Sequence, residues 1–249
     1  MPMVVLECED LCKSFGGIKA ADHLSLSFEA GRVTALIGPN GAGKTTIFHL
    51  ISGSLKPDGG KITLKGSRID GRPPWQVASL GIGRLFQDVR VFPRLTVREN
   101  LLVACPPNLR MRPWRDMLRA SRPAAPKDQI ETLLAIWDLA AQADVLAGAL
   151  SYGQQKLLAM ARLTMMNPLV LLLDEPTAGI NLMLIPQLMA ALRRLAREGT
   201  AVVVIEHNMQ VVLDVADWVY FLDEGQLTAF GLPAEVLSDS KALHAYLGV

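Results

Sequence analysis

The sequence is short of cysteine, of net charge and of long apolar runs, and each shortage excludes a class of protein. Its 249 residues include 3 cysteines and carry a formal net charge of +1. Three cysteines do not supply the disulfide framework of a small secreted domain. A charge so near zero gives no overall field that attracts nucleic acid or an anionic membrane. We therefore expect a protein with reduced thiols that binds no nucleic acid.

Long apolar runs and a secretory signal are missing as well. The strongest runs, residues 169–173 and 201–205, are far shorter than the roughly 20 residues that a membrane helix needs. They are typical of buried strands. No N-terminal segment joins a basic start to an apolar stretch, so we expect no secretory signal. Because 50% of the residues are apolar, the sequence predicts a packed core in a cytosolic chain that is soluble by itself.

The cysteines give no sign of a metal site. Cys8 and Cys12 are four positions apart, but no histidine or third cysteine lies near them in the sequence, and Cys105 is remote. Metal sites built on cysteine usually show paired ligand spacing. We therefore expect buried or incidental thiols.

Turn signals and apolar periodicity divide the chain into strands and helices. The expected strands lie at residues 24–28, 33–37, 61–65, 169–173, 201–205, 218–222 and 226–230. The expected helices cover residues 45–52, 96–104, the stretch around 130–137, a stretch to about 197, another to about 216, and a final piece ending at Leu247. From residue 169 onward strands and helices alternate, which predicts an α/β fold with a mixed, mostly parallel sheet.

Residues 38–45 fit the phosphate-binding loop pattern G-x-x-x-x-G-K-[ST] at every fixed position. Glycines let backbone N–H groups point at phosphate oxygens, and the helix that begins near Gly43 adds its positive end. Lys44 is expected to supply charge for the β- and γ-phosphates, and the Thr45 hydroxyl can ligate Mg²⁺. A chance glycine-rich turn is the alternative, but the match follows an apolar strand and opens a helix. The expected nucleotide-binding residues here are Gly38, Pro39, Asn40, Gly41, Ala42, Gly43, Lys44, Thr45 and Thr46.

An acidic pair, Asp174 and Glu175, follows the apolar run 169–173. The carboxyl end of a buried strand is where ligands gather in open α/β sheets. Asp174 is expected to hold the magnesium through water, and Glu175 to polarise the attacking water as general base. Read alone, two acids after a strand also fit an ordinary solvated turn.

A second helix start has the chemistry of an anion site. Ser151 precedes a helix and Gln154 stands three residues later, which is the spacing of a capping box. A well-capped helix is the structural alternative. Its exposed N–H groups also attract anions, and Gly153 allows a phosphate to approach closely. Because one chain needs only one phosphate loop for ATP, this helix suggests a nucleotide held by another subunit.

With these segments in this order, the chain resembles the ATP-binding cassette (ABC) ATPases of membrane transporters over nearly its whole length. Residues 150–154 resemble the family's signature motif, with Tyr152 where many members carry glycine. The resemblance implies ATP and Mg²⁺ as cofactors. It also implies a P-loop NTPase core with an N-terminal antiparallel β subdomain, in residues 1–87 and 166–249, and a helical signature subdomain in residues 88–165.

The same resemblance assigns roles to residues that would mean little singly. Gln87 matches the Q-loop, a ligand of Mg²⁺ that also takes part in catalysis, and His207 matches the switch histidine. Phe15 matches the aromatic residue that stacks on adenine, although a lone phenylalanine usually belongs to a core. Residues 178–181 match the D-loop, with Asn181 where aspartate is common, and an apolar stretch follows at residues 182–184.

Within the family, the chain is most similar to the ATPase subunits of branched-chain amino acid importers. The likeness rests on residues 13–20, 150–155, 205–209 and 245–248. ATPases of urea or amide importers and of lipopolysaccharide exporters share much of the pattern and are the alternatives. The implied partners are a second ATPase subunit, identical or different, transmembrane permease subunits and a solute-binding protein. The implied location is the cytoplasmic face of the plasma membrane.

The implied mechanism closes two ATPase subunits around ATP, between the phosphate loop of one and the Ser151 helix of the other. Coupling to the membrane subunits would run through Gln87 and the helical lobe. A soluble ABC ATPase of translation or DNA repair usually has two fused cassettes or a coiled-coil insertion, and neither is present. A metabolic kinase would not explain the second helix start, and a regulatory module would not need both Glu175 and His207.

The segment 106–126 departs from the rest of the chain. It holds five prolines and also the arginines Arg110, Arg112, Arg115, Arg119 and Arg122. The segment fits a solvated loop, or a contact with a membrane subunit or with lipid headgroups.

Overall fold

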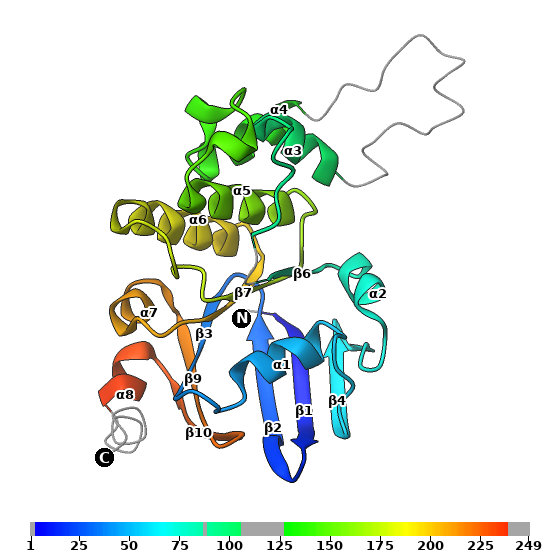
Figure 1. The fold of residues 1–249 in the computed structure, drawn as a ribbon. Helices are drawn as coiled ribbons and strands as arrows, with labels where there is room; N and C mark the ends of the chain where they lie inside the picture. Colours follow the sequence, from blue (N-terminus) through cyan, green and yellow to red (C-terminus); the bar gives the residue numbers. More distant parts are fainter. Residues whose placement is uncertain (1–2, 87–88, 106–126, 239–249) are drawn as a thin grey trace, which may run out of the picture. The chain divides into compact units, whose positions relative to one another are not determined.

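A computed structural model describes residues 3–86, 89–105 and 127–238. The chain divides into two compact units (Figure 1). The first consists of Met1–Arg84, Leu169–Pro176 and Leu192–Val249, and the second of Leu85–Pro168 and Thr177–Ala191. Gln87, the arginines of segment 106–126 and the expected helix end at Leu247 lie outside the described residues. Within those residues, no helix is both long enough and apolar enough to cross a bilayer.

Two sheets form within the described residues. The first is antiparallel, in the order β2 (Ile18–Glu29), β1 (Val4–Phe15), β4 (Gly59–Leu64) and β5 (Ser67–Arg68). The second has the order β10 (Gln226–Gly231), β9 (Trp218–Asp223), β3 (Val33–Ile37), β8 (Ala201–Ile205), β7 (Val170–Asp174) and β6 (Ile82–Leu85). β9, β3, β8 and β7 are parallel, and β10 closes an antiparallel hairpin with β9. The predicted α/β fold with its antiparallel N-terminal sheet is confirmed.

The helices are named here in the order in which they occur along the chain. They are α1 (Lys44–Ile51), α2 (Pro74–Ser79), α3 (Val97–Ala104), α4 (Lys127–Ile136), α5 (Tyr152–Thr164), α6 (Ile185–Arg197), α7 (Met209–Val215) and α8 (Pro233–Ser238). Short 3₁₀ turns cover Ala140–Gln142, Ala147–Ala149 and Leu182–Leu184. Strands β3, β8 and β9 lie where their apolar runs predicted them. β1, β5, β6 and α2 were not predicted.

The core of the first unit joins its two sheets through α1. Ile47 and Phe48 of α1 pack in one buried cluster with Phe28 of β2 and Leu172 of β7. Their side chains are entirely removed from water, so each contributes about 1.5–3 kcal/mol of apolar burial. This packing fixes the start of α1 against the end of β3, where the phosphate-loop motif lies.

In the second unit, α3, α4 and α5 pack against one another. The predicted capping box at Thr96 is present, since its hydroxyl accepts from Glu99 N and the Glu99 carboxylate accepts from Thr96 N. Asn100 is fully buried, and its amide binds the backbone of Phe92 through both its oxygen and its nitrogen. These bonds hold the loop before α3 in place.

Candidate functional site

The phosphate-loop motif forms a tight turn between β3 and α1 that two of its glycines make possible. Gly38 has φ +143°, and a Cβ on it would lie 2.0 Å from the carbonyl oxygen of Leu222. Gly43 has φ +95°, and a Cβ on it would lie 2.0 Å from the carbonyl oxygen of Ala20. Any side chain at either position would collide with backbone atoms. Packing therefore requires glycine at these two positions of the motif, whether or not a phosphate binds.

Lys44 lies inside the turn. Only 6% of the residue is exposed, and Nζ donates to the carbonyl oxygens of Gly38 and Pro39, both at 2.7 Å. Burial lowers the pKa of Lys44, while the carboxylates of Glu175 and Asp174 act in the opposite direction. The ammonium is therefore held next to the acidic pair, at the place where a polyphosphate needs positive charge.

The start of α1 presents free backbone donors. Its N-cap is Gly43, whose lack of a side chain leaves the first-turn N–H groups without a side-chain cap. Thr45 is exposed and Thr46 half-buried. A helix N-terminus of this kind attracts anions through these donors and through the helix dipole.

The acidic pair closes the other side of the site. Asp174 ends β7 and is 4% exposed; burial raises its pKa, against the attraction of Arg84, His207 and Lys44. Glu175 has φ +47°, and its N–H donates to the carbonyl oxygen of Ile205 at 3.0 Å. Its Oε1 lies 3.1 Å from His207 Nε2. The left-handed backbone at Glu175 turns this carboxylate towards His207 and stores strain at the site.

A cavity of about 210 Å³ brings these predicted residues together. It is lined by Ala20, Asn40, Gly41, Ala42, Gly43, Lys44, Thr45, Thr46, Glu175, Ile205 and His207. The phosphate loop, the expected general base and the expected switch histidine therefore share one hollow in the first unit. Phe15, at the end of β1, is outside this lining; it is 45% exposed, and Lys13 Nζ lies 5.5 Å from its ring centroid.

The second predicted anion site lies in the second unit, at the start of α5. Ser151 caps the helix: its Oγ accepts from Gln154 N at 3.3 Å, and Gln154 Oε1 accepts from Ser151 N at 3.1 Å. Gly153 is buried, and a Cβ on it would lie 3.0 Å from Leu184 Cδ1. The surrounding cavity, of about 410 Å³, is lined by Ser151, Tyr152, Gly153, Gln154, Gly179, Asn181, Met183 and Leu184.

Two buried, positively charged side chains of the described residues, Arg84 and Lys156, were not predicted from the sequence. Arg84 is 9% exposed and donates through Nη1 to Ser52 Oγ at 3.0 Å. Its charge opposes the rise in pKa that burial imposes on Asp174. Lys156 is 3% exposed and donates to the carbonyl oxygen of Ala178 at 2.8 Å, which ties α5 to the loop after the acidic pair. Nothing in the local sequence distinguishes these side chains from solvated ones.

Comparison with known proteins identifies similar chains of nearly the same length. Residues 21–178 match the ABC transporter family. The high-affinity branched-chain amino acid transport ATP-binding protein LivG of Salmonella typhimurium is 38% identical, over 100% of this chain and 99% of LivG. The corresponding protein BraF of Pseudomonas aeruginosa is 37% identical, over 100% and 99%. The lipopolysaccharide export system ATP-binding protein LptB of Haemophilus influenzae is 33% identical, over 99% and 98%.

Solved structures agree with these relatives. The ADP conformation of MJ1267, an ATP-binding cassette of an ABC transporter, superposes with a TM-score of 0.83 at 34% identity, over 99% of this chain and 100% of that one. The protein cbiO1 of Clostridium perfringens, part of the ABC transporter complex cbiONQ, gives a TM-score of 0.77 at 28% identity, over 96% of this chain and 92% of that one.

Proposed function

The chain belongs to the ABC transporter family and is an ATPase, and from that premise we propose that it powers the import of branched-chain amino acids. The observation that carries the solute class is the full-length likeness to LivG and BraF, at 38% and 37% identity. The likeness to LptB is weaker, at 33%, and keeps a lipopolysaccharide exporter as the alternative. A urea or amide importer is the other alternative that the sequence pattern allows.

In the proposed cycle, the residues of the 210 Å³ cavity act on the triphosphate of ATP. Lys44 and the N–H groups at the start of α1 hold the β- and γ-phosphates. Glu175 polarises the attacking water, and His207, 3.1 Å from its carboxylate, keeps that carboxylate directed at the reaction centre. The exposed ring of Phe15 stacks on adenine.

The donor set fits Mg²⁺. Asp174 and Thr45 provide a carboxylate and a hydroxyl, which are the hard oxygen ligands that this ion prefers. Burial raises the pKa of the Asp174 carboxyl, which means that its ionised form is disfavoured there. A bound cation such as Mg²⁺ would stabilise that ionised form. We propose that Thr45 and Asp174, together with Gln87, hold the ion. Bound there, Mg²⁺ supplies charge that stabilises the transferring phosphoryl group.

The site is completed by a second ATPase subunit. Ser151, Gly153 and Gln154 present the capped start of α5, and we propose that they bind the γ-phosphate held by the partner's loop. Residues 88–165 and Gln87 then transmit closure to permease subunits at the cytoplasmic face of the plasma membrane. A solute-binding protein delivers the amino acid on the other side.

Uptake by the assembled transporter tests the solute class. The chain is co-expressed with the permeases and binding protein of its transporter, in a host that lacks branched-chain amino acid uptake, and radiolabelled leucine and urea are offered separately. ATP-dependent leucine uptake that Lys44→Ala abolishes supports the proposal. Urea uptake without leucine uptake contradicts the solute class, and association with an exporter of lipopolysaccharide contradicts import.

A further inference from the structure

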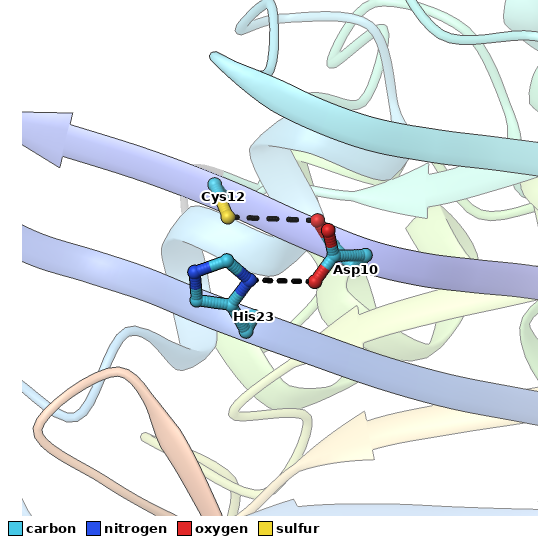
Figure 2. Close-up of side chains that lie close together, drawn as sticks. All are labelled: Asp10, Cys12 and His23. Carbon is cyan, nitrogen blue, oxygen red and sulfur yellow. Dashed lines mark hydrogen bonds and ion pairs between the residues drawn. The ribbon is translucent and has the colours of Figure 1, made fainter.

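Three side chains with metal-binding chemistry meet on the N-terminal sheet, and none of them lines the ATP cavity described above. Asp10 and Cys12 come from β1 and His23 from β2 (Figure 2). One ligand atom from each lies within 4.8 Å of the other two. Cys12 is half-buried, whereas the side chains of Asp10 and His23 are 70% and 69% exposed.

A distortion of β1 and β2 produces this cluster. The pairing of β1 with β2 shifts register between Cys8 and Leu11, and again between Leu11 and Lys13. Asp10 and His23 have φ +51° and +53°, a left-handed backbone that side chains rarely adopt. On the other side of β1, Gly60 packs so closely that a Cβ on it would lie 2.4 Å from the carbonyl oxygen of Asp10. Bulges of this kind re-aim side chains, and here they turn Asp10 and His23 towards each other.

We propose that Asp10, Cys12 and His23 bind one Zn²⁺ ion. Thiolate, imidazole and carboxylate are the three ligand types that zinc takes in proteins, and solvent water completes the tetrahedron at so exposed a position. From zinc–ligand bond lengths, the ligand atoms of one site stand about 3.3–3.6 Å apart. Small side-chain rotations of exposed residues therefore close the present separations.

The contacts within the cluster favour this ligand set. His23 Nδ1 lies 2.6 Å from Asp10 Oδ1, so these two ligand atoms already lie on the same side of the sheet and face each other (Figure 2). The Cys12 Sγ lies 3.5 Å from the carbonyl oxygen of Asp10. An exposed pair such as His23 with Asp10 contributes little to stability, so a metal ion replaces that hydrogen bond readily.

A second carboxylate stands behind the histidine. Asp22 Oδ1 lies 3.9 Å from His23 Nε2, and the Asp22 carboxylate is itself held by Lys19 and Gln226 at 2.9 Å each. Ligating histidines usually give their other ring N–H to such a carboxylate, which fixes the tautomer and strengthens the ligand. This 3.9 Å separation is longer than a hydrogen bond, so we include Asp22 in the proposal as the residue that would accept from Nε2 once His23 rotates onto the metal.

Cobalt titration of the full-length, reduced protein tests the site. Co²⁺ replaces Zn²⁺ and shows a thiolate-to-metal charge-transfer band only if cysteine is a ligand. We expect one equivalent of Co²⁺ to produce the band and one equivalent of Zn²⁺ to abolish it. Because the ATP site contains no cysteine, metal bound at Asp174 or His207 gives no such band.

The variants separate a site from a chance cluster. Cys12→Ser should abolish the band, His23→Gln and Asp10→Asn should each weaken binding at least about tenfold, and Asp22→Asn by about 10–100-fold. Cys105→Ala, which removes a buried thiol elsewhere, should change nothing. ATP binding by every variant checks that it folds. A wild-type protein without the band, or a band that survives in Cys12→Ser, overturns the proposal.

Discussion

The left-handed backbone at Glu175, with φ +47°, directs its carboxylate into the site. Glutamine has the same length and leaves this geometry unchanged. We expect Glu175→Gln to keep ATP binding and to lower turnover at least about 100-fold, because the amide cannot accept the proton of the attacking water. Phosphate release and nucleotide binding are the measurements. Glu224→Gln is the matched control, since Glu224 has nearly the same φ, +45° against +47°, in a hairpin turn. Near-normal turnover of the Glu175 variant would exclude this residue as the base.

Asp174 illustrates a conflict between function and stability at a single residue. Burial raises its pKa in the folded protein, so ionisation above that pKa disfavours folding. In the absence of nucleotide and Mg²⁺, Asp174→Asn should therefore unfold at a higher temperature than wild type at neutral pH. The difference should shrink as the pH falls towards the ordinary aspartate range, about pH 4, where the carboxyl of the folded protein is protonated and that of the unfolded chain is about half protonated.

Thermal unfolding between about pH 4 and about pH 8 measures this difference. The exposed Asp214→Asn serves as control and should show no such pH-dependent gain. The same Asp174 variant should lose ATP hydrolysis. A wild-type protein that is more stable than Asp174→Asn at neutral pH in metal-free buffer would contradict this account of burial.

At the scale of elements, the two capping boxes allow a structural role to be separated from a functional one. Ser151 caps α5 and Thr96 caps α3 with the same reciprocal bonds. Ser151→Ala and Thr96→Ala should each lower the free energy of unfolding by about 1 kcal/mol. If Ser151 also binds a γ-phosphate, only the Ser151 variant should hydrolyse ATP more slowly, when both variants are compared at equal concentrations of folded protein. If both variants lose hydrolysis equally, Ser151 acts only as the N-cap of α5 and does not bind the γ-phosphate.

Elements with strong local signals were predictable, and those shaped by distant contacts were not. The strand Val33–Ile37 was predicted to the residue, because its apolar run ends at the glycine turn. The strand Val4–Phe15 was missed, because its register shifts interrupt the alternation of apolar and polar residues.

The residues of the candidate sites also fall into two groups, those that the sequence predicted and those that it did not. The residues of the phosphate loop were predictable from fixed spacing, since one loop supplies them all. Arg84 and the trio of Asp10, Cys12 and His23 were not, because they depend on which segments pair across the fold. No metal site was predicted at Cys12, because no histidine or third cysteine lies near it in the sequence and His23 meets it only when β1 pairs with β2.

At the scale of the whole molecule, the proposed function requires two chains. The phosphate-loop motif lies in the first unit, and the capped start of α5, which we propose reads a phosphate, lies in the second. If the latter reads a partner's nucleotide, ATP should drive association whenever hydrolysis is blocked. We expect Glu175→Gln to sediment as a dimer with ATP and Mg²⁺ and as a monomer with ADP or without nucleotide.

The double variant Lys44→Ala/Glu175→Gln provides the control, since loss of the Lys44 charge should weaken nucleotide binding and leave the chain monomeric under all three conditions. Addition of Ser151→Ala to Glu175→Gln separates binding from association. Nucleotide should still bind to the first unit, while the dimer should weaken at least about tenfold, the effect of one lost charge-assisted hydrogen bond. A dimer of equal stability in that variant would show that association does not run through the start of α5.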